Sequence, residues 1–118
     1  VGKIIWSDKE SDIDKVTAVS GSGPAYYFLF IEHLISEAAK LGLKQKIAVE
    51  LVYQTALGSV DLLLKGKKSS RELRKIIAVK GGTTEAAINI FERKSQFKKI
   101  IGQALNAAYN RSKRLGDN

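Results

Sequence analysis

The sequence predicts an all-α fold of about five helices, and three observations support this prediction. Helix-forming residues dominate the chain, and Pro24 is the only proline in 118 residues. Apolar residues recur at steps of three and four, as they do along one face of a helix. Alternation of apolar and polar residues is nearly absent outside the β-branched run 1–6, which we expect to be the end of a strand. The length suits one domain, and 44% apolar residues supply a core.

The first long helix is expected to begin at Gly23-Pro24, because proline at the first helical position gives up no hydrogen bond. Ser22 precedes it as a candidate cap. The helix is expected to reach about Leu41, where Gly42 offers a C-terminal stop. The polar stretch 7–14 before it is interpreted as a linker or a first helical turn. Further helices are expected at about 46–64, ending at Gly66; from 70 or 71 to 77, capped by Ser69 or Ser70; from 83 or 84 to 92; and at 96–115, ending at Gly116.

The first half of that first helix, Ala25–Ile31, is apolar on every side. Such a helix has to be covered all round, so we expect a partner chain or a further domain to cover it. The run is too short to span a bilayer, and it predicts no membrane segment. The sequence shows no signal peptide and contains no methionine. We therefore expect a cytoplasmic protein, and a chain that is either processed or a fragment.

Composition excludes several kinds of site. Cysteine is absent, which excludes a disulfide scaffold, a thiolate metal site and a cysteine nucleophile. His33 is the only histidine, which excludes a His-pair metal site within one chain, and we expect no metal. Because His33 follows an apolar helical run beside Glu32, we interpret it as a helix-surface or interface residue rather than a catalytic one.

The strongest local motif for chemistry is Lys80–Glu85, two glycines and two threonines that enter a helix. N–H groups at a helix start have no intrahelical partners, and the helix dipole adds partial positive charge. The motif therefore suits a carboxylate or a phosphate. The alternative interpretation is a helix cap preceded by a flexible turn.

A second glycine-containing motif, Ser20–Pro24, is also interpreted as a loop that feeds a helix start. Small residues there permit close approach to the backbone. The spacing does not fit a dinucleotide fingerprint, and no strand of adequate length precedes it. The alternative is a simple turn.

Basic residues give the chain a formal charge of +8, and many of them gather between residues 65 and 80. We interpret this cluster as a solvated face, because no helix-turn-helix spacing accompanies it and the aromatic residues lie in apolar runs instead. Its members are Lys65, Lys67, Lys68, Arg71, Arg74, Lys75 and Lys80.

At its two glycine motifs the chain resembles the pyrroline-5-carboxylate reductase family. The resemblance covers nearly the whole chain and keeps the order and spacing of the motifs. The matching stretches are Val16–Tyr26, Ile77–Glu92 and Ala107–Lys113.

The resemblance implies a helical domain of the 6-phosphogluconate-dehydrogenase C-terminal-like type, interlocked with a second protomer as a homodimer or within a higher oligomer. Residues 9–118 would form this dimerisation and substrate-binding domain, and residues 1–8 the tail of an N-terminal Rossmann domain with a linker. The family reduces 1-pyrroline-5-carboxylate to L-proline with NADPH or NADH, the last step of proline biosynthesis. Since the Rossmann domain holds NADP or NAD, this chain alone is expected to bind neither and to be inactive.

In the family the Gly-Gly-Thr-Thr loop binds the substrate. Carried over to this sequence, the N–H groups of Gly82, Thr83 and Thr84 would hold the substrate carboxylate. The Thr84 hydroxyl, the expected catalytic group, would lie near the ring nitrogen and help to protonate it. Val79 and Gly81 belong to the same substrate-binding stretch. The residues expected near the nicotinamide, in the same cleft, are Ser20, Gly21, Ser22, Gly23 and Pro24.

One departure from the family concerns the two residues before the glycines, which are often Ser or Thr followed by Pro. Here they are Val79 and Lys80, so the hydroxyl that helps to hold the carboxylate is lost. A charge-assisted hydrogen bond of this kind contributes about 1.5–3 kcal/mol. Lys80 is a candidate substitute as a charge partner.

A second class of function stays open from the residues alone. The chain would then be a non-enzymatic helical assembly, or an anion- or nucleic-acid-binding module suited by its +8 charge. Such a module predicts binding to DNA or RNA that weakens steeply with salt. The resemblance favours a small-molecule substrate, with no nucleic acid and no membrane as partner.

Overall fold

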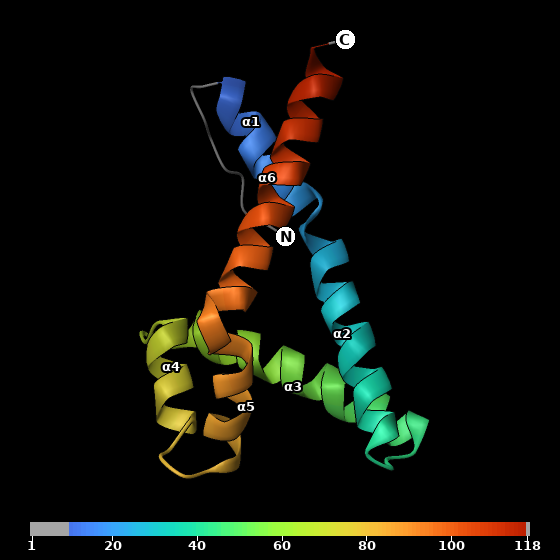
Figure 1. The fold of residues 1–118 in the computed structure, drawn as a ribbon, viewed down its shortest axis with the longest axis vertical. Helices are drawn as coiled ribbons and strands as arrows, with labels where there is room; N and C mark the ends of the chain where they lie inside the picture. Colours follow the sequence, from blue (N-terminus) through green and yellow to red (C-terminus); the bar gives the residue numbers. More distant parts are fainter. Residues whose placement is uncertain (1–9, 118) are drawn as a thin grey trace. The chain divides into compact units, whose positions relative to one another are not determined.

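The computed structural model describes residues 10–117, and every regular element in that range is helical (Figure 1). The all-α prediction is therefore confirmed for this range. The expected strand end at 1–6 and the expected domain boundary at residue 8 lie outside the described residues. In chain order the elements are α1 (Glu10–Val16), the π-helical turn η1 (Thr17–Gly21), α2 (Gly23–Lys40), α3 (Gln45–Lys65), α4 (Ser70–Ile77), α5 (Thr83–Glu92), the 3₁₀ turn η2 (Arg93–Ser95) and α6 (Gln96–Gly116).

Helices α2 to α6 are the five expected ones, and their ends lie within about one residue of the predicted positions. The polar stretch 7–14 had two interpretations, and its described part from Glu10 onward is helical. Gly116 is included in α6, so the expectation that it terminates the helix was wrong by one residue. Between α5 and α6, Lys94 and Ser95 have φ values of 54° and 55°. This left-handed conformation costs a non-glycine residue about 1 kcal/mol, and it separates the two helices.

The chain divides into two compact units. The first contains the residues up to Tyr27 and from Lys94 onward, which in the described range means α1, η1, the start of α2, and α6. The second, Phe28–Arg93, contains the rest of α2 together with α3, α4 and α5.

The segment Ser20–Pro24 was expected to be a loop, and this expectation was wrong. Its first residues complete η1, in which the Ser22 N–H donates to the Thr17 carbonyl, five residues earlier, at 2.8 Å. Pro24 explains the wide turn, because proline has no N–H to give to the Ser20 carbonyl and its ring crowds that group. A π turn accommodates this defect, and α2 begins directly afterwards.

The first unit packs α1, η1 and α6 against one another, with α1 beside α6 (Figure 1). Ala18 and Gly23 are buried there. The Tyr26 hydroxyl donates to the Ala18 carbonyl at 2.7 Å, which supplies a partner for a backbone group of the π turn. Ser112 in α6 donates to the carboxylate of Asp14 in α1, also at 2.7 Å, and so joins the two ends of the chain's described range.

The second unit begins with a helical hairpin whose turn was predicted. Gly42, with φ of 109°, ends α2 as expected. The Gly42 N–H donates to the Ala39 carbonyl at 3.0 Å and the Leu43 N–H to the Ala38 carbonyl at 3.4 Å, which is the Schellman arrangement. Helix α3 then ends at Gly66, again as expected.

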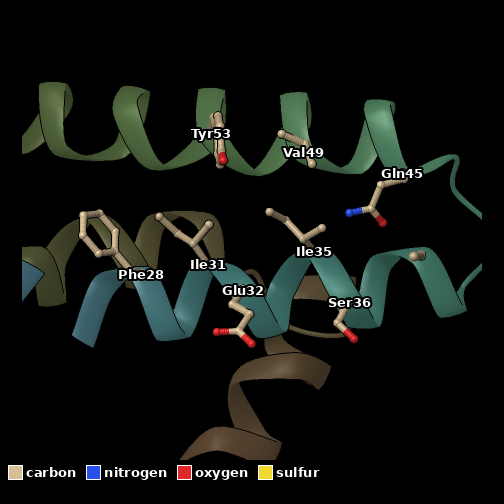
Figure 2. Close-up of a pocket in the computed structure, with 9 residues that line it drawn as sticks. Phe28, Ile31, Glu32, Ile35, Ser36, Gln45, Val49 and Tyr53 are labelled. Atoms are coloured by element: carbon tan, nitrogen blue, oxygen red, sulfur yellow. The ribbon is translucent and has the colours of Figure 1, made fainter. Parts of the chain in front are cut away.

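Helices α2 and α3 bury little of their apolar surface within this chain. Figure 2 shows Ile31 and Ile35 of α2 directed toward Val49 and Tyr53 of α3 across an open hollow of about 780 Å³. Among the described residues, the buried apolar side chains are Ala18 (3% exposed) and Ala48 (0% exposed).

The large apolar residues of these helices are correspondingly exposed: Phe28 keeps 68% and Leu57 67% of its surface accessible. Patches of this kind mark protein–protein or membrane contact. The expectation that the chain does not cover its first long helix by itself is therefore confirmed. Other exposed members are Tyr27, Leu29, Leu34, Leu51, Leu62 and Leu64.

Helix α3 is the one helix in the described range that is long and apolar enough to cross a membrane by length and composition. This is weak evidence for a membrane span, because a helix covered by a partner subunit has the same composition.

Candidate functional site

The turn between α4 and α5 prepares the start of α5. Ala78 (φ −83°, ψ 68°) lies in an inverse γ-turn, in which the Val79 N–H donates to the Ile77 carbonyl at 2.9 Å. The Gly82 N–H then donates to the Val79 carbonyl at 3.0 Å, and Gly81 between them has φ of 77°. This is the pattern of a type II turn, which favours glycine at its third position.

The two glycines of this turn are required for different reasons. Gly81 has a positive φ, which L side chains rarely adopt, although nothing lies within 4 Å of an added Cβ. Gly82 has an ordinary φ of −88°. A Cβ there would meet Val79 Cγ2 at 3.1 Å and the Val79 carbonyl oxygen at 3.2 Å, so a side chain would require Val79 to shift by a few tenths of an ångström.

The start of α5 is open to an anion. Its N-cap is Gly82, which has no side chain to make a cap bond. The alternative interpretation, a helix cap preceded by a turn, stays open beside the anion-site interpretation. Thr83 and Thr84 are the first two helical residues, and an α-helix supplies no partner for N–H groups at these positions. Of the three N–H groups expected to hold a carboxylate, that of Gly82 donates within the turn. Those of Thr83 and Thr84 form the remaining pair.

Glu85 belongs to this site, although the sequence analysis assigned it no role. Its Oε1 accepts from the Gly81 N–H at 3.0 Å. Glu85 is the third residue of α5, the position from which a Glu reaches back over a helix start in a capping box. That pattern was the available signal, and the glycine at the N-cap position concealed it.

Thr84 lies beside a second hollow. It is partly buried, whereas Thr83 is exposed. The hollow has a volume of about 270 Å³ and lies between α3, α4 and α5. A donor pair, a hydroxyl and an apolar hollow side by side suit a small molecule with one anionic and one apolar side. The other lining residues are Ser59, Leu62, Leu63, Ser70, Leu73, Arg74 and Ile77.

An ion pair joins α4 to the last residue of α5. Arg74 Nη1 lies 3.0 Å from Glu92 Oε1, with 40% and 58% of the two side chains exposed. Because solvent screens such a pair, it contributes at most about 1 kcal/mol. Arg74 was interpreted as part of a solvated basic face, and it is instead partly buried in this pair. The other six basic residues of that cluster are exposed, as expected.

The second predicted motif, Ser20–Pro24, lies at the junction of η1 and α2 in the first unit. The Ser20 hydroxyl donates to the Val16 carbonyl at 2.9 Å, within its own helix. Ser22, the expected cap, accepts from the Ala25 N–H through its backbone carbonyl at 3.1 Å. The Lys80–Glu85 motif lies in the second unit, so the expectation that both motifs line one cleft stays a prediction. Over residues 10–117 no acidic or histidine side chains are grouped as metal ligands.

The fold and its exposed apolar faces define a helical domain through which subunits associate. Residues 10–115 match the family model described as pyrroline-5-carboxylate reductase dimerisation, and the chain belongs to this family. The resemblance stated from the motifs is confirmed.

Relatives and solved structures agree with this assignment. The chain is 45% identical over 117 residues to a pyrroline-5-carboxylate reductase of Pseudomonas aeruginosa, covering 99% of this chain and 42% of the relative. The reductase structure from Coxiella burnetii has a TM-score of 0.92 at 43% identity, covering 98% of this chain and 42% of that one. The Plasmodium falciparum structure with NADP bound has a TM-score of 0.88 at 41% identity, covering 96% and 43%. The chain thus spans less than half the length of these relatives.

Proposed function

We propose that the protein containing this chain reduces 1-pyrroline-5-carboxylate to L-proline with NADPH or NADH. Membership of the dimerisation family supports the reaction class. The observation that carries the proposal for this chain is the helix start of α5. There an N-cap without a side-chain bond leaves the Thr83 and Thr84 N–H groups beside a partly buried hydroxyl.

In this proposal the substrate carboxylate binds the N–H groups of Thr83 and Thr84. Two backbone donors and the positive end of the α5 dipole favour an anion there. The exposed side chain of Lys80, in the same turn, adds positive charge. The binding residues proposed from the family are thus used unequally, because Gly81 and Gly82 shape the turn while the threonines supply donors.

Reduction of the cyclic imine adds a hydride to carbon and a proton to nitrogen. We propose that Thr84 supplies this proton: its hydroxyl donates the proton to the ring nitrogen and then regains one from solvent. Holding the carboxylate and the nitrogen at two fixed points orients the ring for reaction, which is where a protein lowers the barrier of a cofactor reaction. The hollow beside Thr84 offers an apolar surface for the ring methylenes.

The nicotinamide cofactor supplies the hydride when it is bound. In the described range the Ser20–Pro24 segment joins the π-helical turn η1 to α2 and is not a glycine loop between a strand and a helix, so these residues do not fit the phosphates of a dinucleotide. We propose that NADP or NAD is held mainly by residues outside this chain. Ser20, Gly21, Ser22, Gly23 and Pro24 then lie near the nicotinamide without binding its phosphates.

We further propose that the chain forms a homodimer through α2 and α3, in a cytoplasmic protein that binds neither nucleic acid nor membrane. The exposed side chains of Phe28 and Leu57 support association with a second copy. The same surface then accounts for the membrane-like composition of α3.

The experiment that tests the proposal is oxidation of NADPH and NADH by the full-length protein, with and without 1-pyrroline-5-carboxylate. Substrate-dependent oxidation with formation of proline is expected, and the isolated chain is expected to show none. A folded, dimeric full-length protein that oxidises neither cofactor would overturn the proposal. Steeply salt-dependent binding to DNA would then favour the binding-module alternative.

A further inference from the structure

We propose that Glu85 is a positioning residue of the substrate loop. Its carboxylate holds the turn at Gly81 and Gly82 in the conformation that keeps the Thr83 and Thr84 N–H groups open to a ligand. What binds there rests on the proposed function, whereas the contact between Glu85 and Gly81 does not.

Helix α4 has a closed helix start, with which the start of α5 can be compared. Ser69 Oγ accepts from the Glu72 N–H at 3.1 Å, and Glu72 Oε1 accepts from the Ser69 N–H at 3.1 Å. This is a complete capping box. Its effect is to satisfy backbone donors at the helix start with the chain's own side chains.

Helix α5 has half of such a box. Glu85 occupies the same third helical position as Glu72, but the N-cap residue is Gly82 and has no hydroxyl to return. Glu85 reaches one residue further back, to the Gly81 N–H at 3.0 Å. The turn is therefore held by a side chain while no side chain occupies the donors of the first helical turn.

The hydrogen bond from the Gly81 N–H to Glu85 restrains the backbone at Gly81. Glycine adopts positive and negative φ about equally, so at Gly81, with φ of 77°, a second restraint supplements the turn's own bond from the Gly82 N–H to the Val79 carbonyl. The carboxylate of Glu85, itself partly buried, gives that restraint because the hydrogen bond forms only when the Gly81 N–H faces α5. Loss of the acceptor releases Gly81, and with it the Gly82 N-cap that sets the direction of the two donors.

The first test compares Glu85→Ala with Glu85→Gln in the full-length reductase. Glutamine keeps an acceptor oxygen and removes the charge, whereas alanine removes both. We expect Glu85→Ala to raise KM for 1-pyrroline-5-carboxylate about tenfold, because the released turn no longer directs both threonine N–H groups at the carboxylate, with kcat changed less than about threefold. Glu85→Gln should stay within about threefold of the parent in both constants.

Glu72 supplies the matched control, since it makes the equivalent bond at the helix start of α4. Glu72→Ala should lower the denaturation midpoint as Glu85→Ala does, and it should leave KM unchanged. Equal KM values for Glu85→Ala and the parent would overturn the proposal. So would a Glu85→Gln protein as impaired as Glu85→Ala, because the acceptor would then not be what matters.

The second readout is amide hydrogen exchange in peptides that span residues 79–84, measured on the full-length protein without substrate. Glu85→Ala should speed exchange there, and Glu72→Ala should not. Unchanged exchange in Glu85→Ala would overturn the contact itself. If the parent protein shows no reductase activity, the proposed function fails, and the exchange measurement still decides whether Glu85 holds the turn.

Discussion

Gly81 and Gly82 lie side by side in the turn before α5 and constrain the site in different ways. Gly81 permits the positive φ. Gly82 leaves room for the Val79 side chain, because a Cβ at Gly82 would lie only 3.1 Å from Val79 Cγ2. Both effects are conformational, and both act on the direction of the threonine N–H groups. A substitution at either glycine should therefore change the backbone shape of the loop before it changes any side-chain chemistry.

Substitution Gly81→Ala should destabilise the protein by about 1 kcal/mol, because alanine is strained at φ of 77°. It should also raise KM for 1-pyrroline-5-carboxylate, since the loop that presents the donors is distorted. Urea unfolding and steady-state kinetics measure the two effects. Gly42→Ala is the control, because Gly42 has φ of 109° in the α2–α3 turn. The Gly42→Ala protein should lose a similar amount of stability and keep the parent's KM. A Gly81→Ala protein with unchanged KM would speak against this loop as the substrate site.

Substitution Val79→Ser restores the hydroxyl that the family often carries before its two glycines. If that hydroxyl reaches the carboxylate, KM should fall about tenfold or more, because one hydrogen bond to a charged group contributes about 1.5–3 kcal/mol. Val79→Ala is the control for the loss of the valine methyl groups against Gly82. A KM that is the same in the serine and alanine variants would mean that Lys80 or the backbone already meets the carboxylate.

At the scale of elements, the junction of α1, η1 and α2 shows how a helix passes a proline. The wide turn of η1 leaves the Ala18 carbonyl dependent on the Tyr26 hydroxyl at 2.7 Å. Substitution Tyr26→Phe should therefore cost about 1 kcal/mol, because it leaves a buried residue's carbonyl without this donor. Thermal unfolding measures the change, and Tyr27→Phe, at a neighbouring tyrosine that is 67% exposed, should be nearly neutral. Equal effects of the two substitutions would contradict this account of the turn.

The same junction shows where sequence patterns stop being informative. The ends of α2 to α5 were predictable because local signals decide them, such as Gly42 at a Schellman turn and Ser69 in a capping box. The Ser20–Pro24 segment has the composition of a loop, yet all of it except Ser22 is helical. Its conformation depends on packing against α6 and on the Tyr26 hydroxyl, and neither can be inferred from neighbouring residues.

The candidate site was predictable to a similar degree. A helix start at Thr83 or Thr84 and a break in the helical pattern at Lys80–Gly82 follow from the motif, and both are found. The roles within the loop were not predictable, because they depend on which N–H groups the turn itself uses. The Gly82 N–H donates to Val79, and Glu85 takes the Gly81 N–H. These bonds follow from turn geometry that residue spacing does not specify.

At the scale of the whole molecule, the chain leaves large apolar residues exposed on α2 and α3. Association with a second copy would bury these residues, so folding and dimer formation should be coupled. The denaturation midpoint should rise with protein concentration.

Substitution Phe28→Asp should shift the protein toward monomer and lower its denaturation midpoint, because a charge replaces an aromatic side chain that is 68% exposed and lines the α2–α3 hollow. Phe28→Leu, which keeps an apolar side chain, should remain dimeric. Sedimentation equilibrium over a range of concentrations distinguishes the two states. A Phe28→Asp protein that stays dimeric with an unchanged midpoint would place the interface elsewhere.

We propose that the start of α5 holds the substrate and that Thr84 protonates it. The most direct measurement is kcat/KM for 1-pyrroline-5-carboxylate in full-length Thr84→Val and Thr84→Ser. Valine keeps the shape and removes the hydroxyl, so kcat/KM should fall about a hundredfold, mostly through kcat. Serine keeps the hydroxyl and should stay within about tenfold of the parent. Equal kinetics for the valine variant and the parent would contradict the claim.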